Sequence, residues 1–367
     1  YTAENMCEIN SHGGNVVMRK ILELVIKNGA RLAEPGEFTK RAFFNGRIDL
    51  SQAESVIDIL NAKTDSETKA SVKQLEGYLS KRIKNIREEL INIMVNIDVN
   101  IDYPEYDIDD VNYNETITKL TNVKNDLEKL KESFNNGKII KEGIKIAIIG
   151  KPNAGKSSLL NSMLKEERAI VTEFEGTTRD TIEEFIQIDG IPIKIIDTAG
   201  IRQAKDEVEK IGIKKSKEMA DEADLIIAIF DITKKIDDED KEILKLIENK
   251  KSIIVLNKID LLNSENTIEN EFKELDKKII KISALNLQGI EELYKEISEI
   301  FKFNEITKNN EIMITNIRHK NLISKSIKNI NEALENLNND MPIDIISINI
   351  KESLEYLGEI TGENVSD

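Results

Sequence analysis

The sequence predicts a multidomain α/β and all-α protein: a domain built as a parallel sheet with flanking helices, inserted into a discontinuous helical bundle. A partial α+β domain precedes the bundle. Three observations predict this class. A phosphate-loop motif follows an apolar run, strands and helices alternate from about residue 143 to 301, and helical spacing flanks this alternation on both sides. Each half-bundle alone would leave an apolar face uncovered, so the two halves are expected to pack together.

Composition limits the functional classes. The chain has 367 residues, too many for one ordinary core, and its 52 basic and 68 acidic residues give a net charge of −16. This negative charge argues against extensive, sequence-independent binding to nucleic acid. The single cysteine, Cys7, excludes an internal disulfide framework, and no apolar run approaches the ~20 residues of a membrane span. These features predict a cytoplasmic protein with no membrane association.

Residues 1–47 combine a short alternating segment, Met6 to Asn10, with a helix-like stretch from Val16 to Lys27. The turn at Pro35-Gly36 leads into a second helix. The region is too small to bury a core by itself, so it is interpreted as part of an α+β domain.

Residues 48–140 are predicted to form the first part of the helical domain. Apolar residues recur at steps of three and four from Val72 to Ile97, in a helix ended by Asp102-Tyr103-Pro104, and again from Leu120 to Phe134, ended by Asn135-Asn136-Gly137. These stripes form either a coiled-coil surface for a partner or, the simpler interpretation, two helices of a bundle. Residues 303–367 repeat the spacing and are predicted to be its second part.

Residues 141–302 are predicted to form the nucleotide-binding domain. Its strands are the apolar runs Ile144 to Ile149, Ile193 to Ile196, Leu225 to Phe230, Ile253 to Leu256 and Ile279 to Ile282.

The motif GKPNAGKS begins at Gly150, directly after the first run. Its glycines allow a tight turn whose N–H groups face a phosphate, and the following helix N-terminus favours an anion. Lys156 supplies a charge for the β- and γ-phosphates, and the Ser157 hydroxyl can bind Mg²⁺. The expected nucleotide contacts in this loop are Asn153, Ala154, Gly155, Lys156, Ser157 and Ser158.

Four later stretches identify the nucleotide as GTP. The Asp260 carboxylate of Asn257-Lys258-Ile259-Asp260 can accept hydrogen bonds from guanine N1–H and the 2-amino group, a donor pair that adenine lacks. Ser283-Ala284 can support the base. Asp197-Thr198-Ala199-Gly200 can hold Mg²⁺ through water and donate an N–H to the γ-phosphate, and Thr177 and Thr178 lie on a segment that the γ-phosphate can order.

Two features depart from the commonest GTPase chemistry. Ile201 occupies the place where many signalling GTPases carry a water-orienting glutamine. Asp206, Glu207 or Glu209 could orient water instead, or could form a solvated helix face. Asn153 could cap its turn or help hold a monovalent cation beside the phosphates.

With these motifs in place, the chain resembles the bacterial and organellar tRNA-modification GTPases of the MnmE (TrmE) type. The stretches that carry the resemblance are PGEFTKRAFFNGRIDLSQAE, GKPNAGKSSLLN, EGTTRDTIEE, DTAGIR, DEVEKIGI and NKID. The first separates this family from other GTPases. The family fold has an N-terminal folate-binding, dimerising domain, a discontinuous helical domain, and a G domain inserted into it.

The resemblance implies roles for individual residues. Asn153, Thr172, Thr177 and the backbone near Phe174 match the potassium ligands, and Ser157 and Thr178 match the magnesium ligands. Glu209 matches the glutamate that orients the attacking water. Glu8 and Arg47 match contacts to a tetrahydrofolate derivative, although a lysine also occurs at the position of Arg47.

The resemblance also implies partners. Family members form homodimers and act with a flavin-containing protein of the MnmG (GidA) type. Together they add an aminomethyl or carboxymethylaminomethyl group to C5 of the wobble uridine of tRNA. The sequence begins at Tyr1 and lacks the family's C-terminal Cys-x-Gly-Lys, so it is expected to be a fragment with impaired folate binding and modification.

Two alternatives remain open at this stage. A ribosome-assembly GTPase would need an RNA-binding appendage, for which this acidic chain offers no basic candidate. A non-catalytic, GTP-gated interaction switch would follow if Ile201 means negligible hydrolysis.

Overall fold

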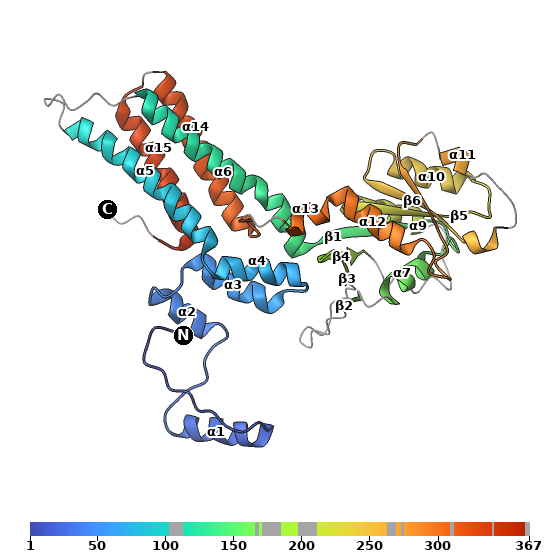
Figure 1. The fold of residues 1–367 in the computed structure, drawn as a ribbon, viewed down its shortest axis with the longest axis horizontal. Coiled ribbons are helices and arrows are strands. Elements are labelled where there is room, and N and C mark those ends of the chain that lie inside the picture. The colour runs from blue at the N-terminus through green and yellow to red at the C-terminus, as the bar shows by residue number, and fades with distance from the viewer. Residues whose placement is uncertain are drawn as a thin grey trace. The chain divides into compact units, whose positions relative to one another are not determined.

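The computed structural model describes residues 1–102, 113–165, 169–170, 185–196, 211–262, 269–272, 275–308, 312–339 and 341–363. The chain divides into two compact units (Figure 1). The helical unit comprises Tyr1–Asn61, Thr68–Phe134 and Ile312–Asp367, and the nucleotide unit comprises Ala62–Glu67 and Asn135–Glu311. The predicted insertion of an α/β unit into a helical one is therefore confirmed.

The nucleotide unit is built on a seven-stranded sheet of order β2-β3-β4-β1-β5-β6-β7. Its parallel part follows the predicted apolar runs, because strands covered on both faces are apolar along almost their whole length. Every residue of β6 is buried, for example. The parallel strands are β4 (Ile191–Ile195), β1 (Ile144–Ile149), β5 (Leu225–Asp231), β6 (Ser252–Asn257) and β7 (Lys278–Ile282).

The sheet is mixed, whereas the sequence predicted a parallel one. β2 (Ala169–Ile170) and β3 (Phe185–Ile188) pair antiparallel at one edge. The turn between β3 and β4 consists of Asp189 and Gly190, whose φ angles are 48° and 82°. Positive φ at both central residues is typical of the two-residue hairpin turn that Asp-Gly favours. An Asp-Gly pair between two apolar-rich segments was a hairpin signal that the sequence analysis missed.

Helices α9 (Ile211–Glu222), α10 (Asp238–Ile247) and α11 (Glu269–Phe272) contribute to one core cluster with alternate residues of β1, β5 and β6. Helix α12 (Ile290–Phe301) lies against β7, and its Tyr294 hydroxyl donates to the Met163 carbonyl of α7 (Lys156–Lys165) at 3.3 Å. The remaining short helices are η1 (Ile259–Leu261) and α13 (Phe303–Lys308).

The helical unit has its own core, formed by α5 (Tyr78–Asp102), α6 (Tyr113–Glu142), α14 (Ile317–Asn338) and α15 (Ile343–Thr361). The apolar stripes are buried within the chain, so the bundle interpretation is confirmed and the coiled-coil partner surface is not needed. The core includes Leu79, Ile83, Ile86, Leu90, Ile93 and Ile97 of α5, Leu120, Val123, Leu127, Leu130 and Phe134 of α6, Ile323, Ile327 and Ile330 of α14, and Ile346, Ile350 and Leu354 of α15.

Two predicted helix limits were wrong. The stripe expected as one helix from Val72 is divided into α4 (Asp65–Leu75) and α5, with Gly77 at a φ of 81° between them. Helix α6 continues through the predicted stop at Asn135-Asn136-Gly137 to Glu142. A helical glycine costs only about 1 kcal/mol, and the continuation buries Ile140, which is 5% exposed.

The N-terminal part contains α1 (Asn15–Lys27) and α2 (Glu37–Phe44), near the predicted positions. Residues 1–47 are all described and contain no strand, so the alternating segment from Met6 to Asn10 is not part of a sheet. Helix α1 has no buried residue. Helix α3 (Leu50–Asn61) follows.

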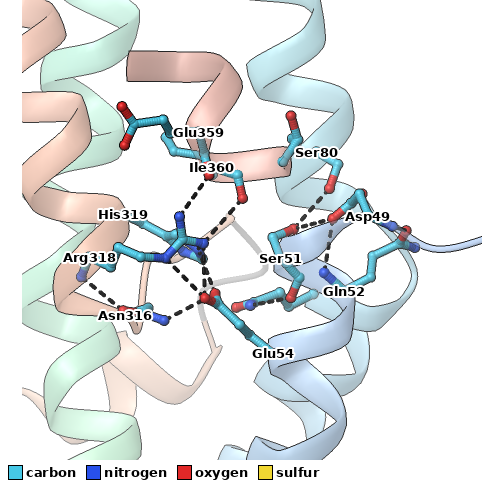
Figure 2. A network of polar contacts seen from close by, with 12 residues as sticks. Asp49, Ser51, Gln52, Glu54, Ser80, Asn316, Arg318, His319, Glu359 and Ile360 are labelled. Carbon is cyan, nitrogen blue, oxygen red and sulfur yellow. Dashed lines mark hydrogen bonds and ion pairs between the residues drawn. The ribbon is translucent and has the colours of Figure 1, made fainter. Parts of the chain in front are cut away.

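A polar network joins α3 to α14 and α15 (Figure 2). The Glu54 carboxylate accepts from Arg318 Nε at 2.9 Å and from Asn316 Nδ2 at 3.1 Å, and it lies 2.9 Å from Nε2 of the fully buried His319. Arg318 also donates to the carbonyl oxygens of Glu359 (2.7 Å) and Ile360 (3.3 Å) in the last turn of α15. One guanidinium therefore pairs with α3 and satisfies carbonyls at the end of α15.

The start of α3 is fixed by neighbouring residues in Figure 2. Asp49 Oδ1 accepts from Gln52 N at 2.9 Å and from the Ser51 hydroxyl at 2.8 Å, and the hydroxyls of Ser51 and Ser80 are 2.9 Å apart. The stretch DLSQAE, residues 49–54, thus forms a junction between α3 and the helices around it. None of the described helices is long and apolar enough to cross a membrane.

Candidate nucleotide-binding site

The phosphate-binding loop joins the end of β1 to the start of α7, in the predicted strand–loop–helix context. Gly150 packs so closely on β5 that a Cβ there would lie 2.5 Å from the Ile229 carbonyl oxygen. Gly155 has a φ of 106°, and a Cβ would lie 2.0 Å from Asn257 Nδ2. Asn153 lies at a φ of 63°, a left-handed conformation that asparagine tolerates better than most residues. Both glycines are therefore required by packing.

Lys156 opens α7, and its ammonium is held by the loop itself. Nζ donates to the carbonyl oxygens of Gly150 (2.6 Å) and Lys151 (2.8 Å). Burial lowers the pKa of Lys156 below its ordinary value, because desolvation disfavours the charged form. A bound phosphate would oppose this effect, since an anion beside the ammonium favours its charge. Ser157 and Ser158 follow in the first turn of α7, and both are exposed.

Asn257, at the end of β6, connects three of the predicted motifs. Its side chain is 3% exposed, donates from Nδ2 to the Ala154 carbonyl at 2.9 Å, and accepts at Oδ1 from the Ala284 N–H at 3.0 Å. One buried amide therefore fixes the phosphate-binding loop relative to the Ser283-Ala284 segment. The structure brings these sequence-distant motifs together as predicted for a nucleotide site.

The base-reading residue Asp260 lies in η1 and is exposed, so a ligand can reach its carboxylate. The Ser283 hydroxyl donates to Asp260 Oδ1 at 2.5 Å and itself accepts from the Asn286 N–H at 3.2 Å. Oδ2 is not part of this contact. Ser283 therefore orients the carboxylate, a more specific role than the general support predicted for it.

Lys258 has a φ of 71°, and its Nζ pairs with Asp231 Oδ2 at 2.6 Å. Asp231 ends β5, and Oδ1 also accepts from the hydroxyl of Thr233 at 2.6 Å. Burial alone would raise the pKa of Asp231, but the hydrogen bonds from Lys258 and Thr233 outweigh it and lower that pKa. The sequence analysis did not identify Asp231.

The sequence analysis also did not predict that the Lys151 side chain pairs with α10. Its Nζ contacts Asp240 Oδ2 at 3.0 Å and, more closely, Asp237 Oδ2, both at the start of α10. Burial acts to lower the pKa of Lys151, but the two carboxylates raise it on balance. Asp237 and Asp240, three residues apart before an apolar helix, signal a capping box in the sequence, but nothing in the sequence signals their contact with Lys151.

Several predicted site residues lie outside the described residues. They include the water-orienting candidate Glu209 and its neighbours Asp206 and Glu207, as well as Ile201. The others are Thr172, Phe174, Thr177, Thr178, Asp197, Thr198, Ala199 and Gly200. Their roles in binding GTP, magnesium and potassium and in positioning water stay predictions.

The predicted folate contacts lie in the N-terminal part. Glu8 is exposed, and Arg47 donates to the Tyr1 carbonyl with its guanidinium 5.1 Å from the centre of the Tyr1 ring. A pocket in this part is lined by neither residue; Arg31, Glu37 and Arg41 on its wall are paired with one another. Folate binding by Glu8 and Arg47 therefore stays a prediction.

Two family models cover almost the whole chain. Residues 50–367 match the MnmE helical domain, and residues 1–47 match the N-terminus of the GTP-binding protein TrmE. Curated relatives named tRNA modification GTPase MnmE, from Acetivibrio thermocellus, Finegoldia magna and Clostridioides difficile, are 51%, 50% and 49% identical. Each alignment covers 100% of this chain and 80% of the relative.

Solved structures give weaker similarity. A crystal structure of Era with MgGDPNP and a segment of 16S ribosomal RNA is 27% identical at a TM-score of 0.33, covering 51% of this chain and 66% of that chain. The G domain of FeoB from Methanococcus jannaschii is 28% identical at a TM-score of 0.32, covering 43% and 98%. At these TM-scores neither superposition carries an argument about function.

Proposed function

This chain belongs to the MnmE family of tRNA modification GTPases, and on that premise we propose that it is a potassium-stimulated GTP hydrolase acting on the wobble uridine of tRNA. The observation that carries the nucleotide site is the pair of hydrogen bonds made by buried Asn257 to Ala154 and Ala284. They join the loop for the phosphates to the segments for the base, as a GTP site requires.

The proposed binding mode follows from the described contacts. The N–H groups of the loop and the start of α7 face the phosphates. Lys156, oriented by the carbonyls of Gly150 and Lys151, directs its ammonium to the β- and γ-phosphate oxygens. Asp260, oriented by Ser283, accepts the N1–H and 2-amino group of guanine. Lys258, fixed by Asp231, lies beside it in the chain.

The available donors fit the two cations that the family pattern implies. Magnesium prefers oxygen ligands, and the exposed Ser157 hydroxyl on α7 is one, with Thr178 proposed as the second. When bound, this ion would neutralise charge on the β- and γ-phosphate oxygens. Asn153, Thr172, Thr177 and the backbone of Phe174 are proposed for potassium; the exposed Asn153 amide oxygen, on a left-handed turn of the loop, is a suitable donor.

Glu209 is proposed to orient the attacking water, because Ile201 has no polar atom to do so. We expect Glu209→Ala to leave the GTP dissociation constant within about threefold and to lower single-turnover hydrolysis by on the order of 100-fold or more. Rapid-quench kinetics with saturating enzyme measures the hydrolysis rate, and titration with a non-hydrolysable GTP analogue measures the dissociation constant. Hydrolysis at the wild-type rate would remove Glu209 from the mechanism and would return attention to Asp206 and Glu207.

In the cell we propose a cytoplasmic homodimer acting with a flavin-containing protein of the MnmG (GidA) type on tRNA. The product is an aminomethyl or carboxymethylaminomethyl group on C5 of the wobble uridine. Glu8 and Arg47 are proposed to contact a tetrahydrofolate derivative, because they match the family pattern.

The test of potassium stimulation is GTP turnover in KCl and in NaCl at equal ionic strength, at several protein concentrations. Faster turnover in KCl, rising with protein concentration, is expected if the cation acts as two G domains pair. Asn153→Ala should abolish the difference between the salts, whereas Asn161→Ala, an exposed asparagine on α7, should keep it. Equal, slow rates in both salts for the wild type would overturn the cation mechanism.

A further inference from the structure

Lys151 follows Gly150 in the phosphate-binding loop, but its ammonium contacts α10. The side chain is 19% exposed, and Nζ lies within hydrogen-bonding distance of carboxylate oxygens of both Asp237 and Asp240. Asp240 itself is largely buried, with a side chain 11% exposed. A lysine that only covered the surface would remain hydrated, so this placement needs another explanation.

The two carboxylates are held rigidly. Asp237 is the N-cap of α10: its Oδ1 accepts from the N–H groups of Glu239 (3.1 Å) and Asp240 (3.2 Å). Asp240 completes the capping box by accepting from Asp237 N at 3.2 Å. Because each carboxylate is fixed by backbone N–H groups, Lys151 is tied to the helix start and not to two mobile side chains.

The main chain of Lys151 faces the phosphate-binding lysine. Its carbonyl oxygen accepts from Lys156 Nζ at 2.8 Å and from Ala154 N at 3.3 Å. The same residue therefore contacts α10 with its side chain and Lys156 with its carbonyl. Asn257 anchors the other side of the loop, at Ala154.

We propose that Lys151 is a positioning residue for the nucleotide. Its ion pairs with Asp237 and Asp240 fix the phosphate-binding loop against α10 and thereby hold the carbonyl that orients the Lys156 ammonium. The inference rests on GTP binding by this loop. Lys151 touches neither phosphate nor base, and acts through Lys156 and the loop backbone.

The test compares Lys151→Met, which keeps the length of the side chain without its charge, with Lys151→Arg and with the control Lys241→Met. Lys241 pairs with Asp238 at 2.9 Å on the same first turn of α10, but this pair is exposed and does not contact the loop. Dissociation constants for GTP and GDP and the single-turnover rate at saturating enzyme are measured for each protein.

Lys151→Met is expected to weaken binding of both nucleotides about tenfold, the size of one lost charge-assisted hydrogen bond, with a rate at saturation within about twofold. Lys151→Arg should recover most of the affinity, and Lys241→Met should bind like the wild type. Wild-type affinity in Lys151→Met would overturn the proposal, as would an equal loss in Lys241→Met.

A double-mutant cycle adds a second criterion. If Lys151 acts through Asp240, the variant carrying both Lys151→Met and Asp240→Asn should bind GTP no more weakly than the weaker single variant. Additive losses would contradict the pairing. Should Lys151→Met fail to fold, the Lys151→Arg and Asp240→Asn variants decide: Asp240→Asn with wild-type GTP affinity would overturn the proposal.

Lys156→Ala separates this inference from the function on which it rests. Loss of GTP binding in Lys156→Ala, with no change in Lys151→Met, would overturn the positioning role alone. Unchanged binding in Lys156→Ala would show that the loop is not the phosphate site.

Discussion

Asn257 uses both ends of its side-chain amide inside the nucleotide unit, where water cannot replace either bond. Asn257→Ala leaves the Ala154 carbonyl and the Ala284 N–H without their partner. A buried donor or acceptor left unsatisfied costs about 1–3 kcal/mol. We therefore expect the free energy of unfolding to fall by at least this amount, and GTP affinity to fall as well. Urea denaturation and nucleotide titration measure the two effects.

The matched control is Asn249→Ala, an exposed asparagine before β6. It should change neither quantity. If Asn257→Ala unfolds and binds GTP like the wild type, the two hydrogen bonds do not organise the site.

Asp260 provides the prediction on base specificity. Asp260→Asn replaces one acceptor oxygen by an N–H donor. The variant therefore loses a charge-assisted hydrogen bond to guanine and can donate a neutral hydrogen bond to the 2-carbonyl of xanthine. We expect GTP affinity to fall by roughly 10- to 100-fold and xanthosine triphosphate to become the better ligand. Competition against a fluorescent nucleotide measures both, and undiminished GTP affinity would refute the base-reading role.

The sequence could place the phosphate-binding loop, Asp260 and the Ser283-Ala284 segment after strand ends, because nucleotide binding favours fixed residue types at these places. It could not reveal partners that only the fold brings together. Lys151 and Asp240 are 89 positions apart, and Lys258 and Asp231 are 27 apart. Neither pair has a spacing that predicts a contact, whereas Asn257 and Asp260 belong to one short motif.

Among elements, the start of α14 is held by charge. Burial alone would raise the pKa of Glu54, but bonds from His319 and Arg318 outweigh it and lower the pKa below its ordinary value of 4.5. A carboxyl whose pKa is lower in the folded state stabilises the protein above its unfolded pKa. That contribution is lost as the pH falls from about 4.5 through the folded value.

We therefore expect Glu54→Gln to lower the free energy of unfolding of the helical unit at pH 7. The difference in free energy of unfolding between Glu54→Gln and the wild type should become smaller as the pH falls below 4.5. Denaturant unfolding followed by circular dichroism across this range measures it. Glu359→Gln, an exposed carboxylate on α15 that contributes only its backbone carbonyl to the network, is the control. A pH-independent gap would mean that the carboxylate charge is not what Glu54 contributes.

The end of α15 tests packing. Gly362 caps this helix at a φ of 77°, and a Cβ there would lie 2.8 Å from the Phe43 ring. Gly46 has a similar φ of 68° with nothing within 4 Å. Gly46→Ala should therefore cost about 1–2 kcal/mol from backbone strain alone, and Gly362→Ala should cost more. If thermal unfolding shows the same loss of stability in Gly46→Ala and Gly362→Ala, the Phe43 ring moves aside at no cost.

Strands and helices were predictable to different degrees. β1, β5 and β6 are apolar along almost all of their length because they are buried on both faces, and such runs are visible in sequence. β7 is a shorter signal, because its Lys278 and Lys281 are exposed. β3 is short and lies near the sheet edge, so its clearest signal was the Asp189-Gly190 turn that follows it. The helix break at Gly77 and the continuation of α6 through Gly137 depend on tertiary burial, which local patterns do not contain.

At the scale of the molecule, each unit has its own buried core. We expect calorimetry to resolve two unfolding transitions. A ligand that binds only the native nucleotide unit stabilises it by about 2.7 kcal/mol at 100 times its dissociation constant, so GDP should raise one transition and leave the other in place. Glu54→Gln should lower the other. A single transition that shifts as a whole with GDP would mean that the two cores unfold together.

The interrupted helical unit has a consequence for synthesis. Helices α5 and α6 leave the ribosome before the nucleotide unit, but their apolar stripes are covered by α14 and α15, whose segment starts only at Ile312. At roughly 5–20 residues per second, the stretch from Phe134 to Ile312 takes on the order of 10 to 35 s to translate. During that interval the apolar stripes of α5 and α6 are exposed, so a holdase chaperone can bind them. The inserted unit can already fold and bind its nucleotide. The order of the chain thus lets the nucleotide unit fold before the helical unit, whose segments precede and follow it in the sequence.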